Sequence, residues 1–302
     1  MKLIKRFILL VAKKLYVLIV IPVIDEIKIN QGIILSRLNE MANIDLENSK
    51  FKVFSQWGED GVLQYLISNL DIRSKTFIEF GVENFLESNC RFLMMKDNWS
   101  GFVVDGSEEK IIELKSMYFY WKYDLNAQSA FIYKSNINEL LKKSGFDNNV
   151  GVLSIDIDGV DYYILEALKD IEASILICEF NSLFGAVRKI SVPYTDNFNR
   201  TKAHYSNLYW GASLPALKSL AGKKGYALVG LNDAFNNAFF IKKELLNSKV
   251  KEKTIDELFG VSKYRESRDN SGNLTFLDHA ARFELIKGLP VYNVETGSIE
   301  NL

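Results

Sequence analysis

From residue 51 onward the chain alternates short apolar segments with longer helical ones, and this alternation constrains the fold most strongly. The short segments are runs of about five to seven residues rich in β-branched and aromatic side chains, the size of strands buried on both faces. Strands alternating with helices form a doubly wound α/β sheet with right-handed crossovers. We therefore predict a Rossmann-like, mostly parallel sheet of about seven strands with one antiparallel edge strand.

The apolar runs and helical segments give specific boundaries. The predicted strands are Thr76–Phe80, Gly101–Asp105, Ala130–Lys134, Val150–Asp156, Ser174–Phe180, Tyr226–Leu231 and Ala238–Lys242. The predicted helices are Asp60–Leu70, Leu86–Lys96, Glu108–Tyr118, Ile137–Ser144, Tyr162–Lys169 and Leu214–Lys223. A short Asn-rich link, residues 232–237, joins the last two strands and is typical of a hairpin, so one of these strands is expected to run antiparallel.

Three parts of the chain are expected to differ in structure. Residues 1–50 are predicted to be an amphipathic helical extension, residues 51–245 the Rossmann-like domain, and residues 246–302 an irregular or helical extension. The last part is charged and less regular than the domain.

The first 24 residues are basic and apolar. Residues 1–14 hold five cations and no acid. The longest uncharged run, residues 15–24, is about half the ~20 residues that a membrane-spanning helix needs, and Pro22 interrupts it. The pattern predicts a basic amphipathic helix that lies in a membrane interface. Docking on its own domain or on a second subunit, as in a homo-oligomer, is the alternative, and residues 25–50 are expected to be polar helix and linker.

Charge and cysteine content narrow the possible partners and the compartment. The net charge of −1 gives no general attraction to nucleic acid, so no nucleic-acid partner is expected. Cys90 and Cys178 are too few for a disulfide framework, and both lie in apolar runs. We expect buried, reduced thiols in a cytoplasmic protein, associated with the inner face of the cytoplasmic membrane if the N-terminal helix binds lipid.

Acidic residues stand at the carboxyl ends of four predicted strands. Ligands of open parallel sheets bind beyond these ends. A buried carboxylate is costly unless it is paired or hydrogen-bonded, so four acidic strand ends on one rim require a reason. The strand ends read Glu79-Phe-Gly81, Asp105-Gly106, Asp156-Ile-Asp158-Gly-Val-Asp161 and Glu179-Phe-Asn181.

The first two strand ends favour a nucleoside-containing cofactor. Gly81 would let a ligand approach the backbone closely. Asp105, followed by Gly106, stands where an acid accepts both hydroxyls of a ribose. Gln56, which precedes the first helix of the domain, is placed to close over a bound cofactor. An ordinary strand-to-helix turn is the alternative for Glu79-Phe-Gly81.

The fourth and fifth strand ends favour acid–base or metal chemistry. Asp156 can hold the charged end of a cofactor or a divalent cation such as Mg²⁺, with Glu179 as a second ligand. Asp158 or Asp161 can act as a general base toward a sugar hydroxyl. The alternative is that Asp158 and Asp161 cap the helix that follows.

One long segment, residues 181–211, shows little periodicity. Loops of this length in compact domains are usually functional or disordered. The segment carries His204, one of two histidines, as a candidate base or metal ligand. A lone histidine is more often structural.

Taken in order, six short motifs resemble those of the FkbM-like methyltransferases, a bacterial group that uses S-adenosylmethionine (SAM). They are Ser55-Gln-Trp-Gly-Glu-Asp-Gly61, Phe77-Ile-Glu-Phe-Gly-Val-Glu83, Trp99-Ser-Gly-Phe-Val-Val-Asp-Gly106, Leu153-Ser-Ile-Asp-Ile-Asp-Gly-Val-Asp-Tyr162, Gly211-Ala-Ser-Leu214 and Asn237-Ala-Phe-Phe240. The resemblance implies a class I methyltransferase fold and O-methylation of a sugar or related hydroxyl, on a glycan or glycolipid of a bacterial surface pathway. By motif position, Glu79 and Gly81 would line the methionine side of SAM, Asp105 the ribose and Asp156 the methyl-transfer cleft.

Two other functions remain open at this point. Asp156-Ile-Asp158 also suits a metal-dependent glycosyltransferase, in which the two carboxylates hold a cation for a nucleotide sugar. A membrane-docked, non-catalytic protein with a vestigial cofactor site is the other, since Phe85 stands where many methyltransferases have a further glycine. The acid that ends the second strand favours SAM.

Overall fold

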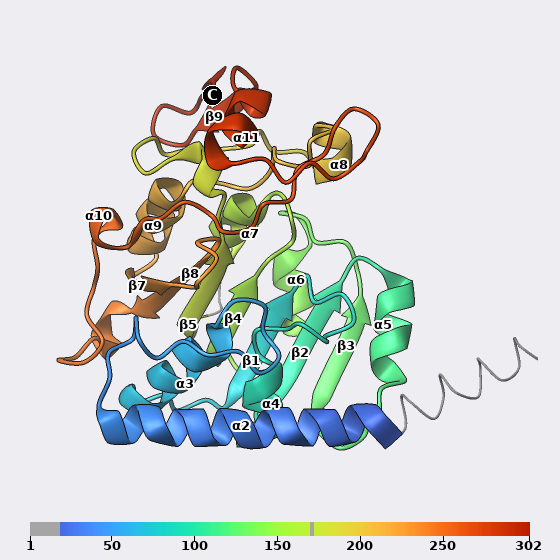
Figure 1. The fold of residues 1–302 in the computed structure, drawn as a ribbon, viewed down its shortest axis with the longest axis vertical. Coiled ribbons are helices and arrows are strands. Elements are labelled where there is room, and N and C mark those ends of the chain that lie inside the picture. Colours follow the sequence, from blue (N-terminus) through green and yellow to red (C-terminus); the bar gives the residue numbers. More distant parts are fainter. Residues whose placement is uncertain (1–18, 170–171) are drawn as a thin grey trace, which may run out of the picture.

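A seven-stranded sheet in the order β3-β2-β1-β4-β5-β8-β7 forms the centre of the computed structural model, which describes residues 19–169 and 172–302 (Figure 1). Every neighbouring pair is parallel except the two pairs that β8 makes with β5 and β7. The strands are β1 (Thr76–Phe80), β2 (Ser100–Asp105), β3 (Leu125–Ser129), β4 (Asn149–Ile155), β5 (Glu172–Glu179), β7 (Tyr226–Leu231) and β8 (Asn237–Lys242). The predicted doubly wound, mostly parallel α/β fold is confirmed. The antiparallel strand lies one place in from the edge, because β7 occupies the edge itself.

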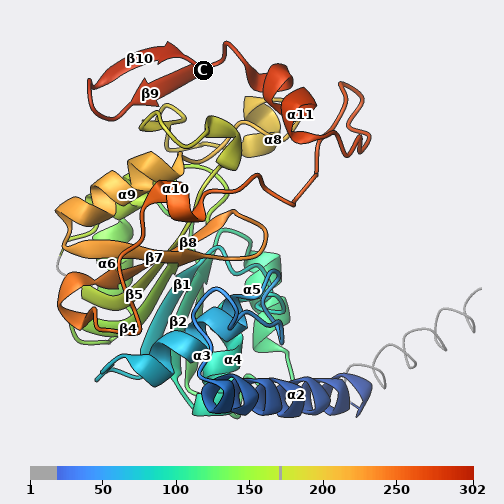
Figure 2. The ribbon, with the colours of Figure 1, turned by 60° about the vertical axis from the view of Figure 1, so that its left-hand side comes forward.

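Helices cover both faces of this sheet (Figures 1 and 2). One face carries α3 (Glu59–Asn69), α4 (Arg91–Asp97) and α5 (Glu108–Lys115), and the other carries α6 (Ile137–Lys142), α7 (Asp161–Ala167) and α9 (Leu214–Lys223). Successive strand residues point to opposite faces. Phe77 therefore packs in the core under α3 and α4, whereas Ile78 packs in the core under α7 and α9.

The prediction of the third strand was wrong. β3 spans Leu125–Ser129, and residues 130–134, which were expected to be the strand, follow it as a loop. Leu125 and Ala127 are buried while Asn126 is exposed. β3 is an edge strand whose apolar residues alternate with polar ones, so it lacks the continuous apolar run that marks a central strand.

A second, smaller sheet lies beyond the carboxyl ends of the large one (Figure 2). Residues 181–213 and 262–302, here called the cap, contribute β6 (Ile190–Ser191), α8 (Arg200–Ala203), α11 (His279–Ile286), β9 (Pro290–Asn293) and β10 (Ser298–Asn301). The order of the cap sheet is β10-β9-β6, and a small apolar core that includes Ile190, Val192 and Val291 supports it. The hairpin of β9 and β10 was not predicted from the sequence.

The helix α2 (Ile21–Ala42) lies across the outside of α3 and α4 (Figure 1). It continues through most of the segment expected to be polar helix and linker. Of the predicted amphipathic helix at residues 1–24, residues 1–18 lie outside the described part of the chain. Among helices of the described ranges, none combines the length and the apolarity that a membrane crossing requires.

A buried ion pair attaches α2 to the domain. The Asp25 carboxylate accepts hydrogen bonds from the Arg91 guanidinium and from the Tyr118 hydroxyl, the latter at 2.8 Å. Arg91 is only 2% exposed, and its guanidinium lies over the rings of Phe54 and Phe119, 4.0 and 4.5 Å from their centroids. The pair therefore fixes both the position of α2 and its rotation about its axis.

Asp25→Ala is expected to lower the free energy of unfolding by about 3–5 kcal/mol, because it leaves the Arg91 charge buried without a partner. Urea unfolding measures this loss. Glu26→Ala, at the exposed neighbouring position, is the control and should change stability by less than about 0.5 kcal/mol. Equal stabilities of the two variants would contradict the role given to the ion pair.

Candidate functional site

A cavity of about 600 Å³ lies between the carboxyl ends of β1, β4 and β5 and the cap. This is within the usual range for sites that bind a cofactor or a drug-sized molecule. Six of the residues predicted for the site line the cavity: Gln56, Glu79, Gly81, Asp156, Asp158 and Glu179. The other four predicted residues, Asp105, Gly106, Asp161 and His204, are not among its lining residues.

The loop after β1 has an unusual backbone. Gly81, Glu83 and Phe85 all have positive φ, at +80°, +46° and +65°. Such a conformation costs a non-glycine residue of order 1–3 kcal/mol and persists only where surrounding structure imposes it. The Phe85 ring is fully buried and stacks on Phe77 at a centroid distance of 6.2 Å. Phe85 therefore keeps a backbone conformation that glycine favours, and its side chain anchors the loop in the core.

Asp105 holds this loop against the end of β2. Its Oδ2 accepts the backbone N–H of Glu83 at 2.7 Å, and its Oδ1 accepts that of Ser107 at 2.8 Å. A carboxylate oxygen can accept more than one hydrogen bond, so both retain capacity for a ligand. Gly106, beside it, lies under the ring of Phe131, which is 67% exposed.

Gly81 is required where the loop passes the end of β4. Its N–H donates to the carbonyl of Val104 at 2.9 Å. A Cβ atom at this position would lie 1.5 Å from the backbone oxygen of Asp156. The close approach brings the loop after β1 and the acids after β4 to one wall of the cavity.

Gly81→Ala is expected to displace the loop after β1 and lower both the melting temperature and ligand affinity, because the new Cβ meets immovable backbone and φ is +80°. Differential scanning fluorimetry measures the first effect and calorimetry the second. Gly222→Ala, in α9 with open space around its Cα, is the control and should be neutral or stabilising. An unchanged melting temperature for Gly81→Ala would contradict this description of the loop.

Glu79 faces the cavity but is already hydrogen-bonded on its other side. Its carboxylate accepts from the Ser88 hydroxyl and from the N–H groups of Asn89, at 2.8 Å, and Cys90, at 3.2 Å. Burial raises the pKa of this carboxyl, and these donors oppose the rise. Glu79 therefore orders the start of α4 while presenting negative charge to the cavity.

Cys90 and Cys178 are buried free thiols, as predicted.

Three carboxylates meet at the centre of the site. One oxygen each from Asp156, Asp158 and Glu179 lies within 4.8 Å of the other two. Glu179 is 6% exposed; its Oε1 accepts from Asn236 at 3.4 Å, and its Oε2 has no partner. Burial, with the neighbouring negative charges, raises the pKa of both Asp156 and Glu179 well above the usual carboxyl range. Two such groups close together cannot both ionise readily, because the charge on one opposes ionisation of the other.

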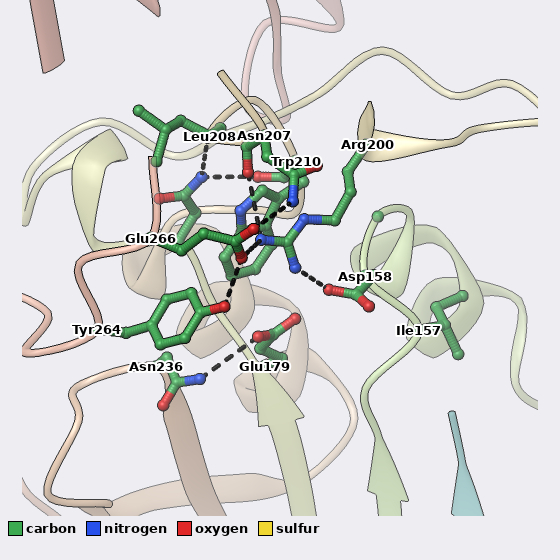
Figure 3. Close-up of polar contacts among 12 residues, drawn as sticks. Ile157, Asp158, Glu179, Arg200, Asn207, Leu208, Trp210, Asn236, Tyr264 and Glu266 are labelled. Atoms are coloured by element: carbon green, nitrogen blue, oxygen red, sulfur yellow. Dashed lines mark hydrogen bonds and ion pairs between the residues drawn. The ribbon is translucent and has the colours of Figure 1, made fainter. Parts of the chain in front are cut away.

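The third carboxylate of the cluster is paired with a cation from the cap (Figure 3). Arg200 of α8 binds the Asp158 carboxylate, and its Nη2 lies 3.6 Å from the Glu266 carboxylate. The Arg200 guanidinium also lies 5.2 Å from the ring centroid of Trp210. The Tyr264 hydroxyl donates to Glu266. Arg200 thus ties the cap to the loop after β4.

These cap contacts have no specific signal in the amino-acid sequence. Tyr264 and Glu266 come from the segment that was expected to be irregular, far along the chain from β4 and β5. No motif marks them, and only the folding of the cap over the sheet brings them to Arg200.

The structure places Asp161 in a supporting position. Its carboxylate accepts the N–H groups of Ile157 at 2.8 Å and Gly159 at 3.1 Å, and the residue is fully buried at the start of α7. Burial raises the pKa of this carboxyl to about 6. Asp161 is therefore neither placed as a general base in the cavity nor a cap of α7, whose N-cap Val160 has no side-chain cap hydrogen bond; its carboxylate holds the turn before the helix.

His204 also lies away from the lining of the cavity. It follows α8, and its Nδ1 lies 2.7 Å from the Ser206 hydroxyl oxygen. Burial lowers the pKa of the imidazole. Since it does not line the cavity, its contacts favour a structural role in the cap.

Gln56 joins the segment before α3 to the loop after β1. Its Nε2 donates to the Glu87 carboxylate at 2.8 Å, and both side chains line the cavity. Gln56 therefore lies at the cavity, and its role over a bound cofactor stays a prediction. The nearby Glu59 has a structural role, because its carboxylate accepts hydrogen bonds from the side chains of Asn232 at 2.7 Å and Asn237 at 3.1 Å.

Comparison with known proteins gives structural likenesses only. No family model matches the chain. A search of curated proteins also finds no match. Among solved structures, a SAM-dependent methyltransferase from Aquifex aeolicus is 11% identical, covering 62% of this chain and 90% of its own, with a TM-score of 0.36. A Staphylococcus aureus protein assigned as a caffeoyl-CoA O-methyltransferase is 14% identical, covering 70% and 99%, with a TM-score of 0.42.

A third such structure is M. capricolum TrmK with S-adenosyl-homocysteine, which is 14% identical. It covers 66% of this chain and 74% of its own, with a TM-score of 0.35. At these identities and TM-scores, the likenesses decide nothing about the chemistry of this chain, which depends on its own site.

Proposed function

We propose that this protein is a SAM-dependent O-methyltransferase whose acceptor is a sugar or related hydroxyl on a bacterial surface glycan or glycolipid. The observation that carries the proposal is the carboxylate pair Asp156 and Glu179, raised in pKa and facing a cavity at the carboxyl ends of a parallel sheet. Ligands of such sheets bind at this place.

The residues of the cavity fit SAM by charge. SAM carries a sulfonium and an ammonium group, and the unpartnered Oε2 of Glu179 offers an unused acceptor for a cation. Glu79 and the loop at Gly81 would hold the amino-acid end, and Gln56 would close over it. Asp105 and Gly106 do not line the cavity, so Asp105 would accept the ribose hydroxyls through its remaining lone pairs only where the nucleoside extends past the loop after β1 to the end of β2. SAM supplies an activated methyl group, so the protein itself needs to align the acceptor and remove one proton.

Asp156 and Glu179 would remove that proton. A carboxylate with a raised pKa is a stronger base near neutral pH than an ordinary one. The proton would pass from the acceptor hydroxyl to the unprotonated member of the pair. Asp158, held by Arg200, would position the acceptor from the cap side.

The cap side of the cavity suits a polyhydroxyl acceptor. Trp210 and Tyr264 line it with aromatic surface, and Asn181 and Glu266 add polar groups. Sites that combine a few aromatic faces with convergent polar groups fix both the orientation and the identity of a ligand. This combination supports a sugar as the acceptor.

Mg²⁺ is the alternative occupant of the three-carboxylate cluster. Oxygen ligands of this kind suit it, but Arg200 already compensates Asp158. We therefore propose catalysis by the carboxylate pair alone. A dependence on added Mg²⁺ that EDTA abolishes would replace that mechanism with a metal-assisted one.

Isothermal calorimetry with SAM tests cofactor binding, and transfer of labelled methyl groups to a panel of bacterial polysaccharides tests the reaction. Asp156→Asn should lower kcat/KM by roughly 10²–10⁴-fold while the protein stays folded. Asp71→Asn, on the exposed surface, is the matched control and should retain full activity.

Failure of the native chain to bind SAM would contradict the proposal. A thermal shift with a uridine diphosphate sugar and manganese, without one for SAM, would indicate a glycosyltransferase instead. An active Asp156→Asn variant would remove the carboxylate pair from the mechanism but not SAM from the function.

The pH dependence follows from the direction of the pKa shifts. The pair acts as a base only when at least one of its two carboxyls is unprotonated, and the pKa of both carboxyls lies above the ordinary range. We expect kcat/KM to rise with pH through this raised pKa, and Glu179→Gln should abolish or displace the rise. A profile already flat from about pH 5 upward would show that the pair ionises like ordinary carboxylates.

A further inference from the structure

The outer face of α2 is apolar and exposed. The α2 stripe consists of Ile19, Val20, Val23, Ile24, Ile27, Ile34, Leu35, Leu38 and Met41. Ile27, Ile34 and Leu38 are 52%, 57% and 53% exposed, and Met41 is 84% exposed. The row runs in two groups, from Ile19 to Ile27 and from Ile34 to Met41, with the exposed Asn30 and Gln31 between them. Exposed apolar groups gathered on one face mark an interaction surface, whereas scattered apolar residues do not.

The side of α2 that packs on the domain is mostly polar, although the partly buried Ile29 also packs there, against the cluster of Val53, Phe54 and Phe92. Its buried residues are Asp25, Gly32 and Ser36. At 3.6 residues per turn these three lie on the side opposite the α2 stripe. A surface helix normally buries its apolar side, so α2 is oriented the opposite way from usual.

Two contacts with the domain fix this orientation of α2. The buried pair of Asp25 with Arg91 fixes one point of the helix. At Gly32 a Cβ would come within 2.5 Å of the side chains of Phe92 and Val53, so the backbone of α2 contacts the domain directly there. Rotating the α2 stripe inward would bury bulky side chains where only glycine fits and would expose Arg91 without its partner.

The charges around the α2 stripe indicate the chemistry of its partner. By helical position, Lys28 borders one side of the stripe and Arg37 the other, while Glu26 and Glu40 lie nearer the domain. The sequence directly before α2 holds five cations and no acid in residues 1–14. Basic residues that flank an apolar strip are typical of helices that lie in the interface of an anionic bilayer.

We propose that the α2 stripe docks on the surface of an anionic lipid bilayer, with α2 lying in the plane of the interface. The apolar side chains would enter the boundary between headgroups and acyl chains, and Arg37 would extend to the lipid phosphates. Lys28, whose Nζ lies 5.9 Å from the centroid of the Phe54 ring, would add positive charge at the edge of the stripe. A second copy of the chain fits this face less well, because it would bring the same cations against each other. Anionic lipid attracts all of them.

Docking through α2 leaves the site accessible. In Figure 1, α2 and the cap lie at opposite ends of the molecule, with the sheet between them. The cavity beneath the cap would therefore face water, away from the bilayer. This surface does not depend on the reaction proposed above, so each can fail without the other.

Co-sedimentation of the full chain with vesicles tests the proposal. Vesicles of phosphatidylcholine are compared with vesicles of phosphatidylcholine and phosphatidylglycerol in equal amounts. The native chain should bind the anionic vesicles, and less so at high salt. Ile27→Glu with Ile34→Glu should weaken this binding by roughly tenfold or more. Lys28→Gln with Arg37→Gln should weaken binding to anionic vesicles only.

Val187→Glu, at an 87% exposed position in the cap, is the matched control and should bind like the native chain. Because Ile27 and Ile34 are exposed, the double variant should unfold at the native temperature. Absence of vesicle binding by the native chain would overturn the proposal, as would full binding by the folded Ile27→Glu, Ile34→Glu variant. A native dimer that this variant makes monomeric, without vesicle binding, would assign the α2 stripe to a second copy.

Discussion

Carboxylates at the carboxyl ends of the parallel strands need hydrogen-bond donors or cations beside them, because a buried and unpaired negative charge is costly. The groups that supply these contacts organise the structure around the cavity. Glu79 is compensated by donors at the start of α4, and Asp161 by the N–H groups of the turn before α7. Asp158 is compensated by Arg200 from the cap. In the part of the chain that the structure describes, Asp156 and Glu179 have neither a cation nor a backbone donor of this kind, and burial with the neighbouring carboxylates raises the pKa of both.

This division separates the acids that build the site from those that remain free for chemistry. The acids bound to backbone N–H groups shape the loops, so their removal would change the cavity as well as its charge. Arg200 couples the cap to the loop after β4, and the cap closes the cavity on the side where an acceptor would lie. The pair Asp156 and Glu179 therefore stands between the proposed cofactor side and the proposed acceptor side.

Much of the fold could be predicted from the sequence, because central strands and caps leave local patterns. The strands Thr76–Phe80 and Tyr226–Leu231 and the helix Leu214–Lys223 begin and end as predicted, the last with the Ser213 side chain at its N-cap. The predicted range of β3 was wrong because the apolar residues of this edge strand alternate with polar ones. The supporting role of Asp161 depends on turn geometry, and the contacts of Arg200 depend on segments far apart in the chain. None of these leaves a pattern that one sequence can show.

The most direct test of the central claim, that the acid-lined cavity is a SAM site, is a crystal structure of the chain with S-adenosylhomocysteine. We expect the amino-acid end of the ligand beside Glu79 and Gly81, and the sulfur on the side of Asp156 and Glu179. A ligand bound away from this cavity, or with its sulfur turned from the carboxylate pair, would contradict it.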